Sequence, residues 1–212
     1  MTQIAETAEI TDPADLRALL GPVMPRAAAK ERPALHERDR EWIGASPFIV
    51  IATSDADGNC DASPKGDPAG FTYVIDEHTI AIPERPGNRR ADGYFNVLSN
   101  PHVGVLFFVP GRNETLRVNG RGRLVRDAPY FDAMVVKGHR PILALEVAIE
   151  TIFFHCGKAF LRSQMWQPES WHPDALPSHA CITNDVQPTG MSLAELETYY
   201  SAEVYNKKLY AA

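Results

Sequence analysis

The sequence has few cysteines, no surplus of positive charge and no long apolar run. Its three cysteines, Cys60, Cys156 and Cys181, are scattered over 212 residues. This excludes a disulfide framework and favours a reducing, cytoplasmic location. The 21 Lys and Arg residues are outnumbered by 27 Asp and Glu, for a formal net charge of −6. A general nucleic-acid binder usually carries a basic surplus, so no nucleic-acid partner is expected.

Signals for export or membrane insertion are also missing. The stretch MTQIAETAEITDPADLRALLG has neither the basic start nor the apolar segment of a signal peptide. The most apolar segments, VGVLFFVPG and LALEVAIETIFF, are too short or too interrupted to cross a bilayer. We therefore expect a soluble cytoplasmic protein without membrane contacts, long enough for one domain with extensions.

From Pro47 onward the pattern is typical of β-structure. Apolar or alternating segments are separated by turn signals such as Asp57-Gly58. The short connections favour an antiparallel sheet curled into a barrel over a doubly wound parallel sheet. Seven strands are predicted, the first six forming three hairpins: 48–54, 60–66, 71–76, 79–84, 102–111, 114–125 and 143–156.

The segment TLRVNGRGRLV shows the strand period most clearly. Because side chains alternate between the faces of a strand, residues 116, 118, 120, 122 and 124 share one face. That face carries only Leu, Val and Gly, whereas the other carries Arg117, Asn119, Arg121 and Arg123. One face can therefore pack, and the other offers donors to a ligand, a partner subunit or water.

Helices are predicted around the barrel and at both ends. A helix capped by Asp12 covers 12–20, another covers 33–46, and short ones lie near 129–138 and 157–166. Residues 167–190 are Pro-rich and are expected to be irregular. A final helix over 192–212 begins with a capping box, Ser192 and Glu195, and its apolar stripe must dock on its own barrel or on a partner. The expected organisation is an N-terminal helical extension (1–46), a barrel with its following short helix (47–166) and a tail with a C-terminal helix (167–212).

Positive charge gathers in the stretch IPERPGNRRADGYFNVLSNP, residues 82–101. A helix is predicted from Arg89 to the residue before Pro101, with Asn88 as its cap. Arg89 and Arg90 would then oppose the helix dipole unless an anion offsets them. This sign argument favours a phosphate site over a helix with exposed arginines. No Walker-type P-loop is present.

The order of these motifs resembles the FMN-binding split barrels related to pyridoxamine-phosphate oxidase, over about residues 36–165. The resemblance rests on ASPKG, IAIPER, GNRR, the helix ending in Asn100-Pro101 and the strand LRVNG. Longer segments, including DASPKGDPAGF, PGRNETLRVNGRGRL and HCGKAFLRSQMW, look like one bacterial subfamily of these flavoproteins. The resemblance implies a mainly β (α+β) fold: a six- or seven-stranded antiparallel split β-barrel with peripheral helices.

The resemblance also implies the cofactor contacts. Arg89 and Arg90 match the basic pair that grips the FMN phosphate, and Asn88 matches the hydroxyl-bearing position before them. Ser63 and Lys65 match the strand that reaches phosphate and ribityl oxygens.

Further contacts are implied along the ring and across a dimer interface. Ile82 and Pro83 match the strand along the flavin ring, and Arg85 lies close enough to join. In this family the cofactor lies at a homodimer interface, so three residues of the next hairpin are expected to contact FMN from the second subunit: Thr115, Arg117 and Asn119.

An FMN-dependent oxidoreductase acting on a small molecule is therefore the leading function. The Arg-x-His signature that the oxidase uses on pyridoxamine phosphate is absent from the chain's end, NKKLYAA, so that substrate is not expected. Two alternatives stay open: a flavin-binding carrier or sensor without turnover, and a split barrel that uses F420 or haem. No catalytic side chain is predicted, since in flavin enzymes the cofactor performs the electron chemistry.

The remaining motifs carry weaker hypotheses. Lys158, Arg162 and Trp166 recur at four-residue spacing, so they should share a helix face. That face could hold an acidic substrate, reach the flavin from the partner chain, or simply be exposed and salt-bridged to Glu or Asp. The His and Cys residues fit no standard zinc spacing, and no metal site is predicted. Asp61 and Asp67 are interpreted as isolated turn carboxylates.

Overall fold

The computed structural model describes residues 8–210, and its contacts divide the chain into two units, Met1–Glu31 and Arg32–Ala212. The first unit contains α1 (Pro13–Leu20) and α2 (Pro25–Ala28), neither of which buries a residue. Asp12 caps α1 as predicted, since its carboxylate accepts a hydrogen bond from the backbone N–H of Ala14 at 2.6 Å. The three-part organisation with boundaries at 46 and 166 stays a prediction.

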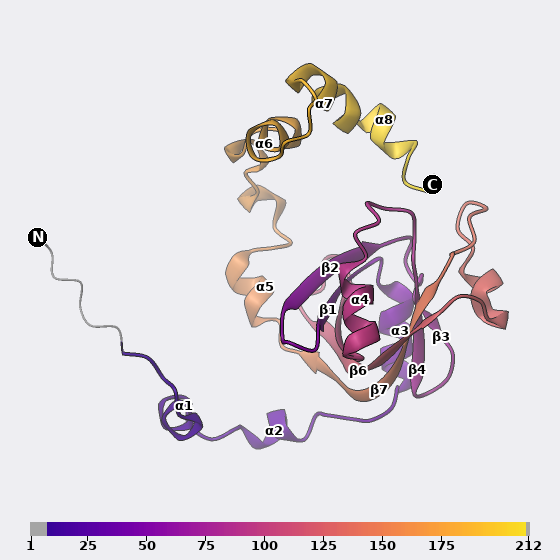
Figure 1. Ribbon diagram of the computed structural model, residues 1–212. Helices are drawn as coiled ribbons and strands as arrows, with labels where there is room; N and C mark the ends of the chain where they lie inside the picture. The colour runs from indigo at the N-terminus through magenta and orange to yellow at the C-terminus, as the bar shows by residue number, and fades with distance from the viewer. Residues whose placement is uncertain (1–7, 211–212) are drawn as a thin grey trace, which may run out of the picture. The chain divides into compact units, whose positions relative to one another are not determined.

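The second unit is built on a seven-stranded antiparallel sheet that forms a split barrel (Figure 1). The strand order is β2-β1-β5-β6-β7-β4-β3. All pairings are antiparallel, and the predicted hairpins β1–β2, β3–β4 and β5–β6 are confirmed. The strands are β1 (Phe48–Ser54), β2 (Cys60–Gly66), β3 (Tyr73–Val74), β4 (Thr79–Pro83), β5 (His102–Phe108), β6 (Thr115–Val125) and β7 (Ala144–His155).

The alternation predicted for β6 is present. Leu116 and Val118 are fully buried, whereas Arg121 and Arg123 are exposed. Between Asn119 and Gly120 the register with β7 shifts in a bulge. A Cβ on Gly120 would lie 2.0 Å from the carbonyl oxygen of Ala148, so only glycine fits where the two strands approach most closely.

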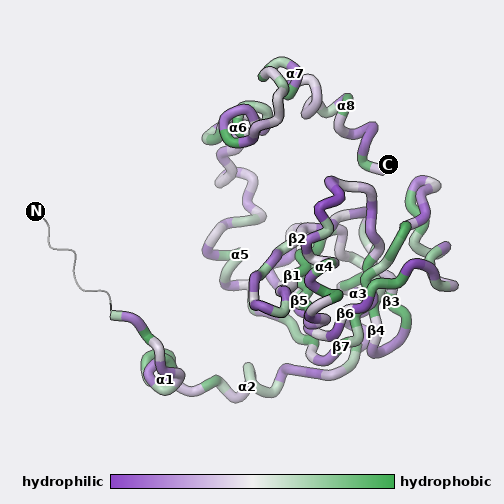
Figure 2. The backbone as a smooth tube through the Cα atoms, viewed as in Figure 1, coloured by the Kyte–Doolittle hydropathy of each residue, from purple (hydrophilic) through white to green (hydrophobic). Residues whose placement is uncertain are grey.

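The core lies inside the sheet. It consists mainly of β-branched and aromatic side chains whose alternate positions face inward, and these appear as hydrophobic segments along the strands in Figure 2. The largest fully buried side chains of the strands include Ile49, Ile80, Ile82, Phe107 and Ile152. Strands β1 and β4 to β7 thus contribute to the main apolar cluster, and a smaller second cluster lies around Phe131 and Met134.

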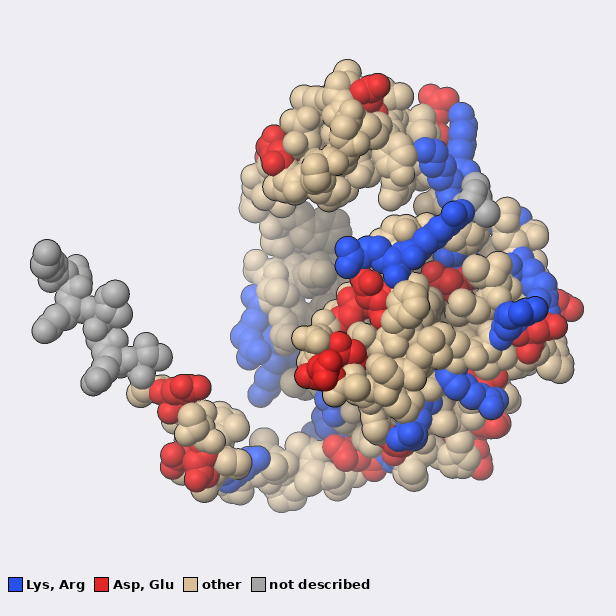
Figure 3. All heavy atoms as spheres, viewed as in Figure 1, with Lys and Arg blue, Asp and Glu red and all other residues tan. Residues whose placement is uncertain are grey.

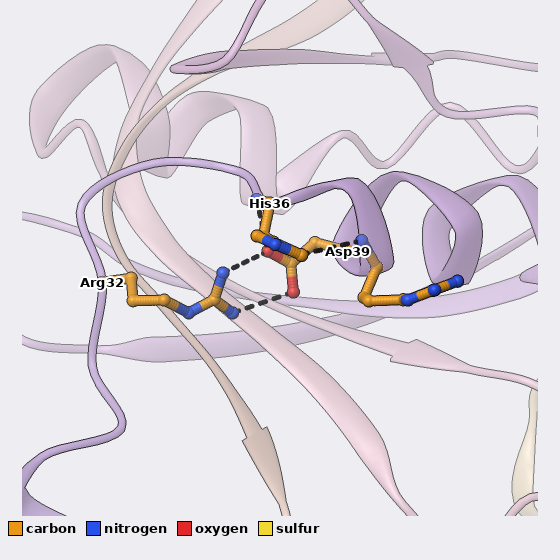
Figure 4. A network of polar contacts seen from close by, with 4 residues as sticks. Arg32, His36 and Asp39 are labelled. Atoms are coloured by element: carbon orange, nitrogen blue, oxygen red, sulfur yellow. Dashed lines mark hydrogen bonds and ion pairs between the residues drawn. The ribbon is translucent and has the colours of Figure 1, made fainter.

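The segment before β1 is tied to the barrel by a buried carboxylate. Arg32 forms a backbone bridge with Ile152 of β7. Its guanidinium pairs with both oxygens of Asp39, at 2.5 and 2.9 Å, and the Asp39 side chain is fully buried (Figure 4). Asp39 also accepts from the backbone N–H of His36, the N-cap of α3 (Glu37–Ala45). This network holds α3, whose Ile43 belongs to the core, against the sheet.

Helix α4 (Asp92–Ser99) lies against β1, β2 and β6 (Figure 1). The short helix predicted near 129–138 is confirmed as a 3-10 turn, η1 (Pro129–Met134), and α5 (Lys158–Ser163) follows β7. Two further 3-10 turns, η2 (Pro168–Ser170) and η3 (Pro173–Ala175), come next.

The prediction for the tail was partly wrong. An α-helix, α6 (His179–Val186), forms where an irregular segment was expected, because the Ser178 hydroxyl caps it by accepting from Cys181 N–H. The capping box of Ser192 and Glu195 is confirmed.

The final helix is not continuous. It divides into α7 (Leu193–Tyr200) and α8 (Ala202–Asn206), with Ser201 ending one and capping the other. The α7 stripe docks on α6, where Leu196 is buried and the Tyr200 ring meets the His179 ring edge-on. The last two residues of the predicted helix lie outside the described residues. Nothing in residues 8–210 forms a helix long and apolar enough to cross a membrane.

Candidate functional site

A pocket of about 280 Å³ opens between β2 and the start of α4, and we call it the arginine-loop pocket. Strands β1 and β2 supply one wall, and the connection from β4 to α4 supplies the other. Its polar lining residues are Thr53, Asp61, Ser63, Lys65, Glu84, Asn88, Arg89, Arg90, Asp92 and Tyr94. Gly93, at the start of α4, also lines the pocket. A Cβ on this residue would lie 3.2 Å from the Asp61 carboxylate and fill part of the space.

The connection into α4 has an unusual backbone. Arg89 and Ala91 both adopt left-handed φ angles, 62° and 59°, although neither is glycine. The Asn88 side chain accepts a hydrogen bond from the backbone N–H of Arg90 at 3.0 Å. The helix therefore begins at Asp92 and not at Arg89, so the predicted start and the predicted Asn88 cap are both wrong. Asn88 shapes the turn before the helix instead.

As a result, the start of α4 is open. Its N-cap is Ala91, which has no side chain able to accept a hydrogen bond. The backbone N–H groups of Asp92 and Gly93 have no acceptor among residues 8–210. Unpaired N–H groups at a helix N-terminus carry partial positive charge and attract anions.

The charges of the pocket are unevenly paired. Arg90 forms an exposed ion pair with Asp92 at 2.7 Å. The Asp92 carboxylate therefore offsets the positive charge of Arg90, one of the two arginines for which the helix-dipole argument required an anion. By contrast, the Arg89 side chain has no hydrogen bond or ion pair with any residue in the described range. Figure 3 shows Lys or Arg side chains lying against Asp or Glu side chains on this face of the molecule. Arg89 is therefore the cation most available to a bound anion.

Lys65, Glu84 and Tyr94 form a polar group in the depth of the pocket. The Lys65 ammonium lies 2.6 Å from the Glu84 carboxylate, and the Tyr94 hydroxyl donates to the same carboxylate oxygen. Lys65 also lies over the Tyr94 ring, 5.0 Å from its centroid. Burial, followed by the adjacent Glu84 charge, raises the pKa of Tyr94 far above its usual range. Tyr94 is thus a neutral donor at any physiological pH.

A second pocket of about 370 Å³ shares a wall with the first, and we call it the C-terminal pocket because Leu209 lines it. Ser63, Lys65 and Glu84 belong to both pockets. The interpretation of Asp67 as an isolated turn carboxylate is wrong. Its side chain is 1% exposed, pairs with Arg85 at 2.5 Å, and accepts from the Tyr210 hydroxyl at 2.5 Å.

Comparison with known proteins agrees with this architecture. A family model described as pyridoxamine 5'-phosphate oxidase matches residues 35–156, more than half of the chain. The chain belongs to this family. Strands β1 to β7 and both pockets, except for Leu209, fall within the matched residues. No curated protein matches the chain significantly.

Solved structures show distant similarity. HupZ from Group A Streptococcus is 18% identical, with a TM-score of 0.46, over 57% of this chain and 93% of that one. General stress protein 26 from Bacillus anthracis is 14% identical, with a TM-score of 0.38, over 57% and 94%. An FMN-binding protein from Syntrophomonas wolfei is 14% identical, with a TM-score of 0.41, over 56% and 89%. These values are too low to indicate which ligand this family member takes.

The predicted site residues separate into three groups. Ser63, Lys65, Asn88, Arg89 and Arg90 are brought together in the arginine-loop pocket. Pro83 and Arg85 line the C-terminal pocket, and the Ile82 side chain points into the core with 0% exposed. The remaining five line neither pocket in a single chain: Thr115, Arg117, Asn119, Lys158 and Arg162.

Arg85 has a structural role in this arrangement. Its Nε donates to Asp67, and its two terminal nitrogens donate to the backbone carbonyls of Met134, at 2.7 Å, and His139, at 3.3 Å. All three nitrogens therefore already have protein acceptors. Arg85 ties the end of β4 to the η1 region.

The proposed face of Lys158, Arg162 and Trp166 does not form. Helix α5 ends at Ser163, and Gln164 after it is left-handed. Trp166 lies beyond the helix, where its indole N–H donates to the Arg112 carbonyl at 2.8 Å. Its ring stacks on Phe160.

Sequence reasoning missed several lining residues. Asp61 is not a turn residue but lies in β2, where its carboxylate accepts from the Ser63 hydroxyl at 3.1 Å. Glu84 and Tyr94 were present in the basic stretch, but only the folded chain pairs them with Lys65. In residues 8–210, no group of three or more His, Cys, Asp or Glu is arranged to hold a metal ion.

Proposed function

We propose that the protein is an FMN-dependent oxidoreductase acting on a small molecule, with the FMN phosphate held in the arginine-loop pocket. One observation carries this proposal. The open N-terminus of α4 and the unpaired Arg89 line the same pocket. Two independent sources of positive potential with no internal acceptor fit a dianionic phosphate.

The other residues of the pocket fit the rest of such a ligand. The Ser63 hydroxyl and the Lys65 ammonium, both on β2, can reach phosphate or ribityl oxygens. Pro83 ends β4 and lines the second pocket, beside which the flavin ring would lie. Arg85 is omitted from this set because its nitrogens are already committed.

Bound FMN would supply hydride or single-electron transfer. The chain's own residues would bind, orient and exclude water. The pair of Lys65 and Glu84 keeps the depth of the pocket nearly neutral, while Tyr94 remains a protonated hydrogen-bond donor. Together, these three groups would orient the ligand and would add no net charge to the pocket.

A homodimer is part of the proposal. Thr115, Arg117 and Asn119 line neither pocket of their own chain, so they could contact FMN only from a second copy. The Nε of Arg117 is buried and has no hydrogen-bond partner among residues 8–210, and its guanidinium lies 4.1 Å from the Phe153 ring centroid. A partner could supply the acceptor that this donor lacks. Sedimentation analysis of the FMN-loaded protein should give twice the chain mass.

The deciding experiment is FMN binding to wild type and to the Arg89→Ala/Arg90→Ala variant. An absorption spectrum and mass analysis of the released chromophore identify the bound cofactor, and flavin fluorescence gives the affinity. Loss of two charge-assisted contacts should weaken binding by about a hundredfold or more. The matched control is Arg38→Ala/Arg126→Ala, which removes two exposed arginines outside both pockets.

Three outcomes contradict parts of this assignment. Unchanged FMN affinity in the Arg89/Arg90 variant would place the phosphate elsewhere. F420 or haem in the purified protein would keep the fold and replace the chemistry. Bound FMN that is reduced and reoxidised by no donor or acceptor in a steady-state screen would favour a carrier or sensor.

A further inference from the structure

We propose that the C-terminal pocket is a substrate site for an uncharged small molecule, covered on one side by Leu209 with Tyr210 anchored beside it. This inference rests on the proposed function, because it assigns the substrate class of the same site. It follows from how the pocket's charges are paired, what its other walls consist of, and which residues cover it.

Every charged residue that lines the pocket already has a partner of opposite sign. Lys65 pairs with Glu84 at 2.6 Å, and Arg85 pairs with Asp67 at 2.5 Å. The formal charges of the lining therefore sum to zero. No cation is left over for a carboxylate or phosphate, and no anion is left over for an amine.

The Arg85–Asp67 pair is not readily diverted to a ligand. The Asp67 side chain is 1% exposed and the Arg85 side chain 12% exposed, so both are removed from water. Arg85 is also saturated by two backbone carbonyls, and Asp67 by the Tyr210 hydroxyl. A charged ligand would have to lose its hydration without gaining a partner, which is costly in such surroundings.

The uncharged part of the lining mixes apolar and hydrogen-bonding groups. Ser63 and Asn88 add neutral polar side chains, and the apolar side chains are those of Pro64, Phe71, Pro83, Pro86 and Leu209. Phe71 is 7% exposed and belongs to the core, so the barrel interior supports this wall. A pocket whose charges are paired internally, and whose other walls combine apolar side chains with neutral hydrogen-bonding groups, suits an uncharged molecule.

Leu209 covers this pocket on one side, and its position depends on Tyr210, which is anchored beside it. The Tyr210 ring stacks on His139 at 5.6 Å, and the Lys137 ammonium lies 5.3 Å from its centroid. Three contacts from two different segments thus fix the position of a residue at the very end of the described chain.

The test is calorimetric titration with two probes of matching shape, 2-naphthamide and 2-naphthoate. The neutral amide should bind at least about tenfold more tightly than the anion, since the pocket offers the anion no partner. The titration is made with FMN-loaded and FMN-free protein. Calorimetry needs no flavin signal, so a failure of FMN to bind leaves the neutral preference measurable.

Two variants tie the preference to this pocket. Leu209→Arg adds a cation to the lining at a half-exposed position that should tolerate it. It should improve 2-naphthoate affinity about tenfold, whereas the matched control Leu209→Gln should not. The Arg89→Ala/Arg90→Ala variant should lose FMN but keep its preference for 2-naphthamide.

Four results overturn the inference: equal affinity for both probes, preference for the anion, no binding of either at their solubility limits, or binding only when FMN is absent. The last result would mean that the cofactor itself occupies the C-terminal pocket.

Discussion

Lys65 and Glu84 form an ion pair in the wall that the two pockets share, with 2.6 Å between Nζ and Oε2. The side chains are 23% and 20% exposed, so solvent screens the pair only partly. Because Glu84 neutralises Lys65, an anionic ligand in either pocket meets one unpaired cation fewer than the number of Lys and Arg residues in the lining. The pair thereby separates an anion-attracting entrance, at Arg89 and α4, from a neutral interior.

Glu84→Gln should strengthen FMN binding by about tenfold. The amide keeps the shape and can still accept from Tyr94, but it releases the Lys65 ammonium for a ligand oxygen. Fluorescence titration with FMN measures the change. Glu77→Gln, which alters an exposed carboxylate outside both pockets, is the control and should leave the affinity unchanged. Weaker binding to Glu84→Gln would show that this carboxylate holds the ligand directly.

Tyr94 should make stability depend on pH above about pH 10. Its pKa in the folded protein is raised by burial and by Glu84. The protonated form is therefore favoured in the folded state. The stabilisation is complete below the unfolded-state pKa of about 10 and is lost as the pH rises through the folded value. Between pH 8 and pH 11, the difference in unfolding free energy between wild type and Tyr94→Phe should fall by about 1.4 kcal/mol.

Urea unfolding at the two pH values measures that difference. Spectrophotometric titration of the folded proteins gives a second readout. Wild type and Tyr94→Phe should release the same number of phenol protons up to pH 11. One extra proton from wild type would mean that Tyr94 ionises normally.

Tyr210→Phe should loosen the C-terminal segment without unfolding the barrel. It removes the only hydroxyl that the tail donates to Asp67 in the described structure, a charge-assisted contact worth about 1.5–3 kcal/mol. Hydrogen exchange in α8 (Ala202–Asn206) and the residues after it should become faster, while β6 and β7 stay protected. Tyr199→Phe, which changes a more exposed tyrosine of the same tail, serves as the comparison. Equal exchange in the two variants would argue against the Tyr210 anchor.

Gly120→Ala should destabilise the sheet by more than about 3 kcal/mol. The new Cβ would lie 2.0 Å from the Ala148 carbonyl oxygen, so the two longest strands would have to separate. Gly44→Ala is the matched control, because a Cβ there meets no atom within 4 Å and an alanine favours helix α3 by up to about 1 kcal/mol. Chemical denaturation gives the free energy of unfolding of both variants for comparison with wild type. A stable Gly120→Ala protein would contradict the bulge geometry.

Local patterns predicted the strands well. The bounds expected for β1 and β2 agree with the structure, because β-branched runs bounded by turn residues specify both the strand and its hairpin partner. The start of α4 could not be predicted the same way. Two left-handed residues that are not glycine, Arg89 and Ala91, interrupt a stretch with helical composition, and surrounding contacts must hold them there.

By itself, the sequence determined the architecture and the presence of a basic turn before a helix, since both depend on neighbouring residues and on side-chain period. Only the tertiary structure decided which charges remain available. Lys65 and Glu84 are 19 positions apart, and Asp67 and Tyr210 are 143 apart. Such pairs form when distant segments pack together and exclude water. Arg89 is thus left free and Arg85 is not, although both belong to one basic stretch.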